Sequence, residues 1–168
     1  MMNTGLDPSD ALGLRKDQFD GDTVWSVRGK TGNDVAIPIG PTLRQALKEL
    51  AVHDAPTILA NSRGETWTYN GFSTVWHRFK TSLEAQGHIR AGLTLKGLRH
   101  TVATTLREAG LDERRIADLL GQKTPSMARH YSRSANLANK NRETVDALER
   151  ENTRRGKFVK PSSETVKP

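Results

Sequence analysis

The sequence predicts a mainly α-helical fold with a small antiparallel β-sheet, an α+β arrangement. Between residues 41 and 148, apolar side chains mostly recur every three or four positions, which is the spacing of one face of a helix. Two segments near the N-terminus instead alternate apolar and polar residues on either side of a turn, as paired strands do. The 168 residues suffice for one domain with a single core.

The charge of the chain favours a polyanionic partner. Its 26 Lys and Arg residues exceed its 19 Asp and Glu residues and give a formal net charge of +7. Clustered cations gain free energy on a nucleic acid because they release counterions from its phosphates. A basic but merely solvated surface explains the same charge, so charge alone leaves both interpretations open.

Other classes of protein are disfavoured by what the sequence lacks. There is no cysteine, hence no disulfide and no thiolate metal site, and the five histidines lack the paired spacing of metal ligands. We therefore expect no metal site. Asp7 and Asp10 stand where a signal peptide needs an apolar run, and no stretch approaches the roughly 20 apolar residues of a spanning helix. We expect a cytoplasmic protein with no membrane role.

The N-terminal elements are a short helix and a hairpin. Pro8-Ser9-Asp10-Ala11-Leu12 is typical of the first turns of a helix. Residues 23–28 and 34–39 alternate in polarity, and the Gly-Lys-Thr-Gly-Asn segment between them has the composition of a turn. We expect Lys30 near the tip of this hairpin.

Two further helices follow the hairpin. Pro41 suits the first turn of a helix over about 41–50, whose apolar face should pack on the core. Asn70 can cap a second helix. That helix carries the largest aromatic patch in the chain, which we expect to be core: Phe72, Val75, Trp76, Phe79 and Leu83.

The central segment, residues 93–131, predicts three short helices. The first runs from about Lys96 to Glu108, and Gly110 supplies the left-handed residue that closes it. Asp112 caps the second, with Leu111 packing on Ile116, and Gly121 ends it. The third begins at Thr124-Pro125, a capping hydroxyl and a first-turn proline, and carries Met127 and Tyr131 on one side.

The C-terminal region should contribute little to the core. Residues 136–154 form a polar helix with a narrow apolar stripe, Leu137, Val145 and Leu148, suited to docking on another subunit. Residues 156–168 are rich in Lys, Ser and Pro and are predicted to be a disordered basic tail. The predicted domain is therefore residues 1–155.

Cations and a tyrosine are the candidates for chemistry in the central segment. Lys96 and Arg99, three residues apart on a helix, could bind one phosphate together, although a solvated cationic face is the simpler explanation of an isolated pair. His100 is about 100° further round the helix, where a packed or capping role is expected. Tyr131 could act as a nucleophile only if cations stabilise its phenolate; otherwise it is a packed ring with a polar handle.

These residues resemble the catalytic domain of the tyrosine recombinases, also called phage integrases. The resemblance rests on three blocks in the family's order and spacing: Leu98-Arg99-His100-Thr101, Leu119-Leu120-Gly121-Gln122, and Tyr131. Upstream, residues 4–12 (Thr-Gly-Leu-Asp-Pro-Ser-Asp-Ala-Leu) resemble the Thr-Gly-Leu-Arg-x-Ser-Glu-Ala-Leu block, and Lys30-Thr31-Gly32 resembles the hairpin lysine segment. The resemblance covers roughly residues 4 to 150.

The resemblance implies breakage and rejoining of duplex DNA without a metal or nucleotide cofactor, through a 3′-phosphotyrosyl bond. It makes Tyr131 the nucleophile, Arg99 the second arginine on the phosphate, and Lys30 the general acid. Lys96 stands where the family usually has a histidine, with lysine an accepted variant, and Gln122 replaces a histidine or tryptophan. Lys30, Lys96 and Arg99 are thus also the expected DNA-binding residues.

Asp7 departs from the family pattern, which has its first catalytic arginine at this position. A carboxylate there should repel the pentavalent phosphate, and loss of one preorganised donor alone costs roughly 10² to 10³ in rate. The helical DNA-clamping domain that normally precedes this domain in the family is absent from the 168 residues, so we expect weaker DNA binding.

Three functions remain open at this point. The first is a recombinase catalytic domain impaired by Asp7. The second is a catalytically inactive, truncated module that binds DNA or docks through residues 136–154, either in a homo-oligomer or on an intact recombinase. The third is a helix-turn-helix regulator built on residues 96–131, which needs neither Lys30 nor Tyr131.

Overall fold

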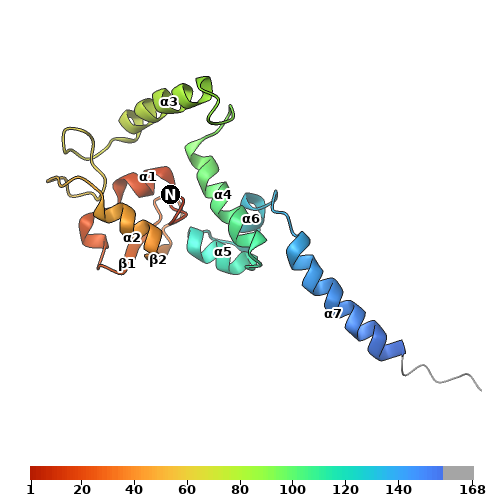
Figure 1. Ribbon diagram of the computed structural model, residues 1–168. Coiled ribbons are helices and arrows are strands. Elements are labelled where there is room, and N and C mark those ends of the chain that lie inside the picture. The colour runs from red at the N-terminus through yellow and green to blue at the C-terminus, as the bar shows by residue number, and fades with distance from the viewer. Residues whose placement is uncertain (157–168) are drawn as a thin grey trace, which may run out of the picture.

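The computed structural model describes residues 1–156 and shows helices around one two-stranded sheet (Figure 1). The expected tail lies outside the described residues except for Gly156, the last residue of the final helix. In chain order the elements are α1 (Pro8–Gly13), a 3₁₀ turn (Lys16–Gln18), β1 (Thr23–Val27), β2 (Asp34–Pro38), α2 (Pro41–Lys48), α3 (Tyr69–Ala85), α4 (Leu95–Glu108), α5 (Glu113–Leu120), α6 (Pro125–Tyr131) and α7 (Ala138–Gly156).

The hairpin is confirmed, with each strand one residue shorter than predicted. β1 and β2 are antiparallel, and their register runs from Thr23 opposite Pro38 to Val27 opposite Asp34. Side chains alternate across the sheet, because successive residues of a strand face opposite sides. Val24 and Ser26 are buried, whereas Trp25 is exposed.

Two apolar clusters hold the chain together. One joins α1 to the hairpin, and Leu43 and Leu47 of α2 pack against it as predicted. The other is formed by α4, α5 and α6. The first consists of Leu6, Ala11, Leu14, Val24, Val35, Ile37 and Ile39, and the second of Val102, Ala103, Ile116, Ala117, Leu120 and Ala128.

Local capping sets the end of α4 and both ends of α5 as predicted, but not the start of α6. The Asp112 carboxylate accepts a hydrogen bond from the Arg115 backbone N–H at 2.9 Å and starts α5, which ends at Gly121 with φ 59°. Gly110, with φ 89°, follows the end of α4. Thr124 precedes α6, but its hydroxyl pairs with the Ser126 hydroxyl at 3.0 Å instead of capping the helix.

One carboxylate joins the three central helices. Glu113 at the start of α5 pairs with Arg107 of α4 at 2.6 Å and with Arg129 of α6 at 2.8 Å. These partners, Arg129 first, lower the pKa of Glu113 from 4.5 to about 2. The carboxylate is therefore stabilised in its ionised form by the folded state.

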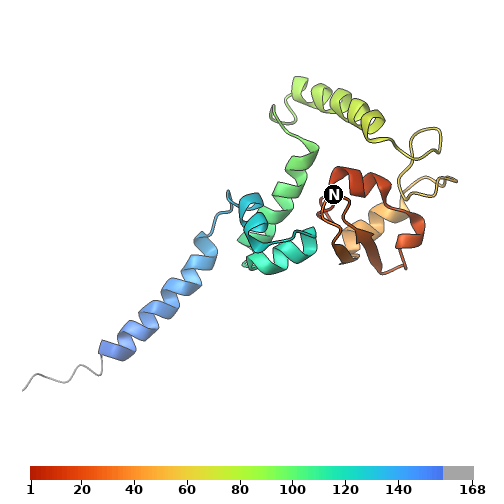
Figure 2. The ribbon, with the colours of Figure 1, turned by 180° about the vertical axis from the view of Figure 1, so that it is seen from behind.

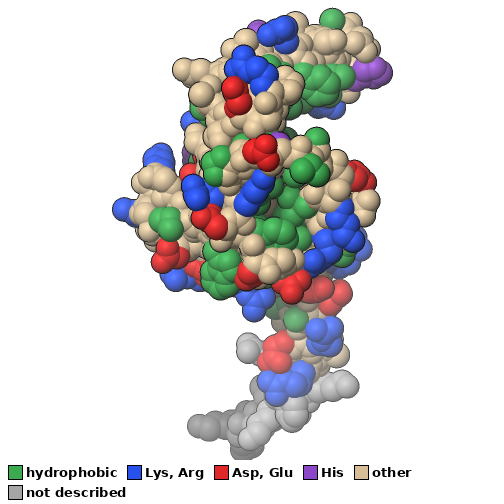
Figure 3. All heavy atoms as spheres, turned by 90° about the vertical axis from the view of Figure 1, so that its left-hand side faces the viewer, with side chains coloured by type: hydrophobic (Ala, Val, Ile, Leu, Met, Phe, Trp, Pro, Cys, Tyr) green, Lys and Arg blue, Asp and Glu red, His purple; other side chains and the backbone are tan. Residues whose placement is uncertain are grey.

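The prediction that α3 belongs to the core is wrong. α3 begins after Thr68, whose hydroxyl accepts from the Gly71 N–H at 3.1 Å, so Thr68 and not Asn70 is its cap. Phe79 is 56 % exposed, and α3 has no buried residue. Both ribbon views show α3 along one edge of the molecule, where it comes close to α1 without entering the core, and hydrophobic side chains remain visible in the upper part of the molecule (Figures 1, 2 and 3). Periodicity identifies an apolar face but not what covers it.

α7 extends away from the rest of the molecule (Figures 1 and 2). Val145 and Leu148 are more than half exposed, in line with the expectation that this stripe does not join the core. No helix in residues 1–156 is long and apolar enough to cross a membrane.

Candidate active site

One cavity of about 340 Å³ brings together all six residues that the sequence singled out at the site. They come from four regions of the chain: the start of α1, the hairpin, α4, and the α5–α6 segment. The lining residues are Asp7, Ser9, Asp10, Arg28, Gly29, Lys30, Thr31, Lys96, Arg99, Gly121, Gln122, Met127 and Tyr131. Its lining includes residues next to members of both apolar clusters, since Asp7 follows Leu6 and Gly121 follows Leu120.

Arg99 bridges the two halves of the site. Its side chain is 6 % exposed, and its Nη1 and Nη2 atoms donate to the carbonyl oxygens of Gly5 at 2.5 Å and Leu120 at 2.6 Å. Burial, reinforced by the positive charge of Arg28, lowers the pKa of Arg99 to about 10. The guanidinium stays protonated at neutral pH, and an anion in the cavity would stabilise it.

Tyr131 is held in place by α4. The His100 ring stacks on the Tyr131 ring, with centroids 4.3 Å apart and 22° between the planes. His100 Nδ1 also lies 3.2 Å from the Tyr131 carbonyl oxygen at the end of α6, so its predicted packed or capping role is confirmed. The Arg99 guanidinium carbon lies 5.5 Å from the Tyr131 ring centroid, within the range of a cation–π contact.

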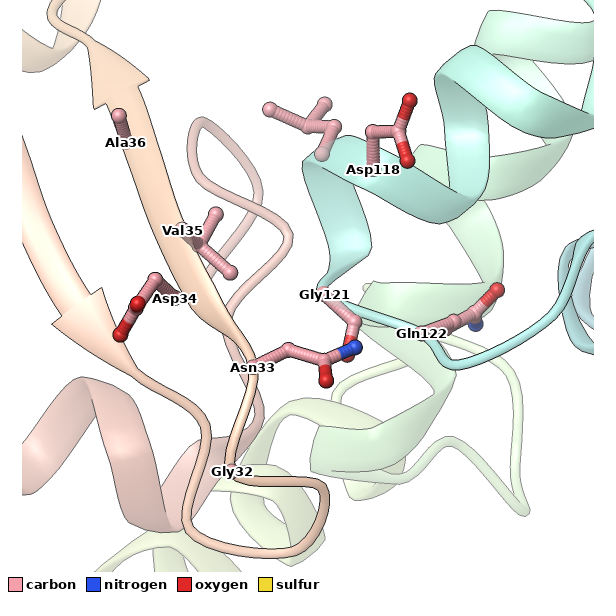
Figure 4. A pocket seen from close by; sticks show the side chains of 9 residues that line it. Gly32, Asn33, Asp34, Val35, Ala36, Asp118, Gly121 and Gln122 are labelled. Atoms are coloured by element: carbon pink, nitrogen blue, oxygen red, sulfur yellow. The ribbon is translucent and has the colours of Figure 1, made fainter.

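Lys30 and Lys96 are exposed and both line the cavity. Lys30 comes from the hairpin and Lys96 from α4. The hairpin tip is fixed to the end of α5, because the Thr31 hydroxyl donates to the Gly121 carbonyl at 3.0 Å and the Asn33 amide reaches the same oxygen at 3.4 Å. Figure 4 shows Asn33 beside Gly121. The backbone on either side of Lys30 is therefore anchored, while its ammonium can reach a ligand.

Gln122 is buried without a hydrogen-bond partner for its side chain. It is 5 % exposed, and neither its Oε1 nor its Nε2 atom forms a hydrogen bond with any of the described residues. In Figure 4 its side chain points away from β2, and Gln122 also lines the open cleft of about 730 Å³ between β2 and α5. A buried amide without a partner costs about 1–3 kcal/mol, so a ligand that bonded it would gain that energy.

Asp7 has a local structural role as well as a place in the cavity. Its carboxylate accepts a hydrogen bond from the Ser9 backbone N–H at 3.3 Å and caps α1. Its negative charge also raises the pKa values of Arg28 and Arg99, against the lowering effect of burial. The carboxylate is thus close enough to both guanidiniums to act on them electrostatically.

Arg28 and Asp10 belong to the site but were not singled out by the sequence. Arg28 is 4 % exposed, and its Nε atom pairs with Asp10 Oδ2 at 3.2 Å. Burial lowers the pKa of Arg28, and Asp10 opposes that shift. The alternation of the strand could have predicted the burial of Arg28. Side chains two positions apart in a strand face the same side, and Arg28 follows the inward-facing Val24 and Ser26 in this series.

A profile of the phage integrase family matches residues 1–137 of the chain. The chain belongs to the phage integrase family. This assignment replaces the helix-turn-helix alternative, since the match includes the hairpin and Tyr131 as well as the central helices. Within residues 1–156, no group of three or more His, Cys, Asp or Glu is arranged to hold a metal ion.

Similar proteins of the phage integrase family are tyrosine recombinases. The chain is 30 % identical over 146 residues to tyrosine recombinase XerD of Lacticaseibacillus casei, a match that covers 81 % of this chain and 48 % of the relative. The crystal structure of XerA recombinase matches with a TM-score of 0.68 at 20 % identity, over 86 % of this chain and 54 % of XerA. The chain spans about half the length of the curated relatives it matches.

A lambda integrase dimer bound to a COC′ core site matches with a TM-score of 0.62 at 26 % identity, over 78 % of this chain and 48 % of the integrase. The predicted fold, a mainly helical tyrosine recombinase catalytic domain with a small sheet, is confirmed.

Proposed function

We propose that this chain is the catalytic domain of a site-specific DNA recombinase, which breaks and rejoins DNA strands through a 3′-phosphotyrosyl intermediate. The observation that carries the proposal is the single cavity that joins Tyr131 to Lys30, Lys96, Arg99 and Gln122. These residues are spread over about 100 positions of sequence, and only the fold makes them neighbours.

The reaction follows from the residues around the cavity. The Tyr131 hydroxyl oxygen attacks the phosphorus of the scissile phosphodiester and loses its proton to solvent. The bond from phosphorus to the 5′ oxygen breaks, and Lys30 protonates that oxygen to give a free 5′-hydroxyl. The phosphate remains linked to Tyr131, so a second 5′-hydroxyl can attack it and rejoin the strands.

The remaining residues stabilise the charge that builds up on the phosphate. Arg99 is preorganised by its two carbonyl contacts, and only two of its five N–H groups are used in them. Gln122 offers a buried amide N–H to a phosphate oxygen, and Lys96 adds a positive charge. Fixed donors of this kind stabilise a transition state because they need no reorganisation.

Asp7 should lower the rate. It replaces the first arginine of the family pattern with a carboxylate in the same cavity as the reacting phosphate. An arginine on a transferring phosphoryl group contributes about 10³ to 10⁵ in rate in other enzymes, so an impaired but measurable reaction is expected.

Duplex DNA is the proposed partner. The net charge of +7 and the exposed Lys30 and Lys96 suit a phosphate backbone. The similar lambda integrase is a dimer on its DNA site, and we propose that this chain also assembles, with the exposed stripe of α7 docking on a neighbouring subunit.

The test is a covalent-adduct assay. The chain is incubated with a library of nicked duplexes of randomised sequence, and adducts are resolved on a denaturing gel. We expect an adduct that Tyr131→Phe abolishes and that Tyr69→Phe, which changes the other tyrosine of the chain, leaves unchanged. Asp7→Arg should raise the adduct yield.

The second candidate is a catalytically inactive module that binds DNA or docks on an intact recombinase. Asp7 in the cavity and the projecting α7 favour it. It predicts salt-dependent DNA binding with no adduct from the parent chain or from Asp7→Arg. DNA binding that shows no dependence on salt would contradict both candidates.

A further inference from the structure

We propose that Arg28 supplies the guanidinium that position 7 lacks, so that it binds a non-bridging oxygen of the scissile phosphate from the hairpin side of the cavity. This inference rests on the proposed function, since it names a further residue that contacts the same phosphate. Arg28 lies outside the motifs by which the family was recognised in the sequence.

The position of Arg28 is the first argument. It follows β1 directly, two residues before Lys30, and lines the same cavity as Arg99 and Tyr131. Its stem packs on Gly121, since a Cβ placed on that glycine would overlap Arg28 Cγ. The absence of a side chain at 121 therefore makes room for the buried Arg28 beside Gln122.

The hydrogen bonding of Arg28 is the second argument. Asp10 holds its Nε atom at 3.2 Å, and the other carboxylate oxygen of Asp10 accepts from the Gly29 backbone N–H at 3.2 Å. The Nη1 atom of Arg28 is buried and has no hydrogen-bond partner among residues 1–156. A purely structural ion pair would leave that donor unsatisfied, at a cost that binding of a phosphate oxygen removes.

A second unsatisfied group lies in the same cavity. The side-chain amide of Gln122, also more than nine-tenths buried, has no partner in the described part of the chain. Two buried donors without acceptors, one charged and one neutral, are an arrangement suited to an anion with several oxygens.

The charges of the cavity are the third argument. Its lining holds four cations, Arg28, Lys30, Lys96 and Arg99, and two carboxylates, Asp7 and Asp10, for a net charge of +2. Without Arg28 the net charge falls to +1, which is less than the two negative charges of the pentavalent phosphate that forms from a singly charged phosphodiester. The positive charge of Arg28 thus compensates the negative charge of Asp7, so that the cavity can still bind a phosphate although position 7 carries an aspartate in place of an arginine.

The test compares phosphate binding and adduct formation in matched variants. Binding of inorganic phosphate is measured by calorimetry at constant ionic strength for the parent, Arg28→Gln and Arg44→Gln. Arg44 is the control, because it also pairs with an aspartate, Asp22 at 2.7 Å, but is exposed and outside the cavity. We expect Arg28→Gln to weaken binding by about 10- to 100-fold, as for loss of one charge-assisted hydrogen bond, and Arg44→Gln to have no effect.

A guanidinium returned to position 7 should rescue the site. The double variant Asp7→Arg/Arg28→Gln is expected to restore phosphate binding to within a few-fold of the parent, and Arg28→Met, which removes the charge and keeps most of the stem, serves if Arg28→Gln does not fold by circular dichroism. A folded Arg28→Gln or Arg28→Met variant that binds phosphate as tightly as the parent overturns the inference, as does a parent that binds no phosphate at low ionic strength.

The adduct assay separates this inference from the proposed function. If the parent forms the Tyr131 adduct and Arg28→Gln forms it equally fast, the function stands and the role of Arg28 is refuted. If no variant forms an adduct while phosphate binding still depends on Arg28, the proposed reaction fails and the anion contact stands. We expect Arg28→Gln to slow adduct formation by about 10²- to 10³-fold.

Discussion

Gly121→Ala should destabilise the protein far more than the same change at Gly110. Both glycines follow a helix with positive φ, 59° at Gly121 and 89° at Gly110, where an alanine costs about 1–2 kcal/mol. A Cβ at Gly110 meets nothing within 4 Å. A Cβ at Gly121 would overlap Arg28 Cγ and lie 2.6 Å from Val35 Cγ2.

Neither neighbour of Gly121 can move away cheaply. Arg28 is buried and paired with Asp10, and Val35 belongs to the hairpin core. Overpacking of this kind costs about 1–3 kcal/mol in addition to the backbone strain. We expect about 2–5 kcal/mol for Gly121→Ala and about 1–2 kcal/mol for Gly110→Ala, where only the strain remains.

Urea unfolding followed by circular dichroism measures both variants. With an m-value of about 2 kcal/mol/M, the midpoint should fall by about 1–2.5 M for Gly121→Ala and by about 0.5–1 M for Gly110→Ala. Equal shifts would show that backbone strain is the whole effect, and would refute the close packing of Arg28 and Val35 against the end of α5.

Three further variants, together with one control, test other contacts. Glu113→Gln should cost about 1–2 kcal/mol at pH 7, a value discounted for the exposure of one partner. Because the pKa of Glu113 is lowered from 4.5 to about 2, this stabilisation is complete above pH 4.5 and disappears as pH falls toward 2. Denaturation across that range should show the loss, and Asp118→Asn, in an exposed pair of the same helix, should have little effect at any pH. His100→Ala should cost about 1–3 kcal/mol through the lost stacking and hydrogen bond, and should slow Tyr131 adduct formation by about 10- to 100-fold; an unchanged adduct rate would argue against a positioning role. Arg99→Lys should cost at least about 1–3 kcal/mol, since lysine is shorter and lacks the planar fork whose two nitrogens reach the two carbonyls, and unchanged urea unfolding would contradict the bridge.

Features set by local chemistry could be predicted from the sequence. The Asp112 cap, the glycine after α5 and the hairpin itself depend on residues a few positions apart, and all were confirmed. The cavity was predicted only through the family motifs, because residues as distant as 30 and 131 carry no local signal of proximity.

Features set by tertiary contacts were missed. The apolar periodicity of α3 is real, but exposure of Phe79 depends on which element packs against the helix. Arg28 is a charged residue at the end of a predicted strand, where exposure is the usual expectation. Its burial depends on the ion pair with Asp10 and on the room left by the missing side chain of Gly121, and both residues are distant from it in sequence. The cap at Thr124 failed because a neighbouring hydroxyl competed for it.

The two carbonyl contacts of Arg99 link the conformation of the protein to the state of its site. Gly5 belongs to the segment before α1 and Leu120 to α5, so separation of the two apolar clusters would remove the support of the guanidinium. Thermodynamic linkage then works in both directions. A phosphate bound to Arg99 favours the arrangement in which the two apolar clusters stay together. A mutation that loosens either cluster weakens phosphate binding at a distance. Under the proposed function, bound DNA would thereby also act as a structural component of the domain.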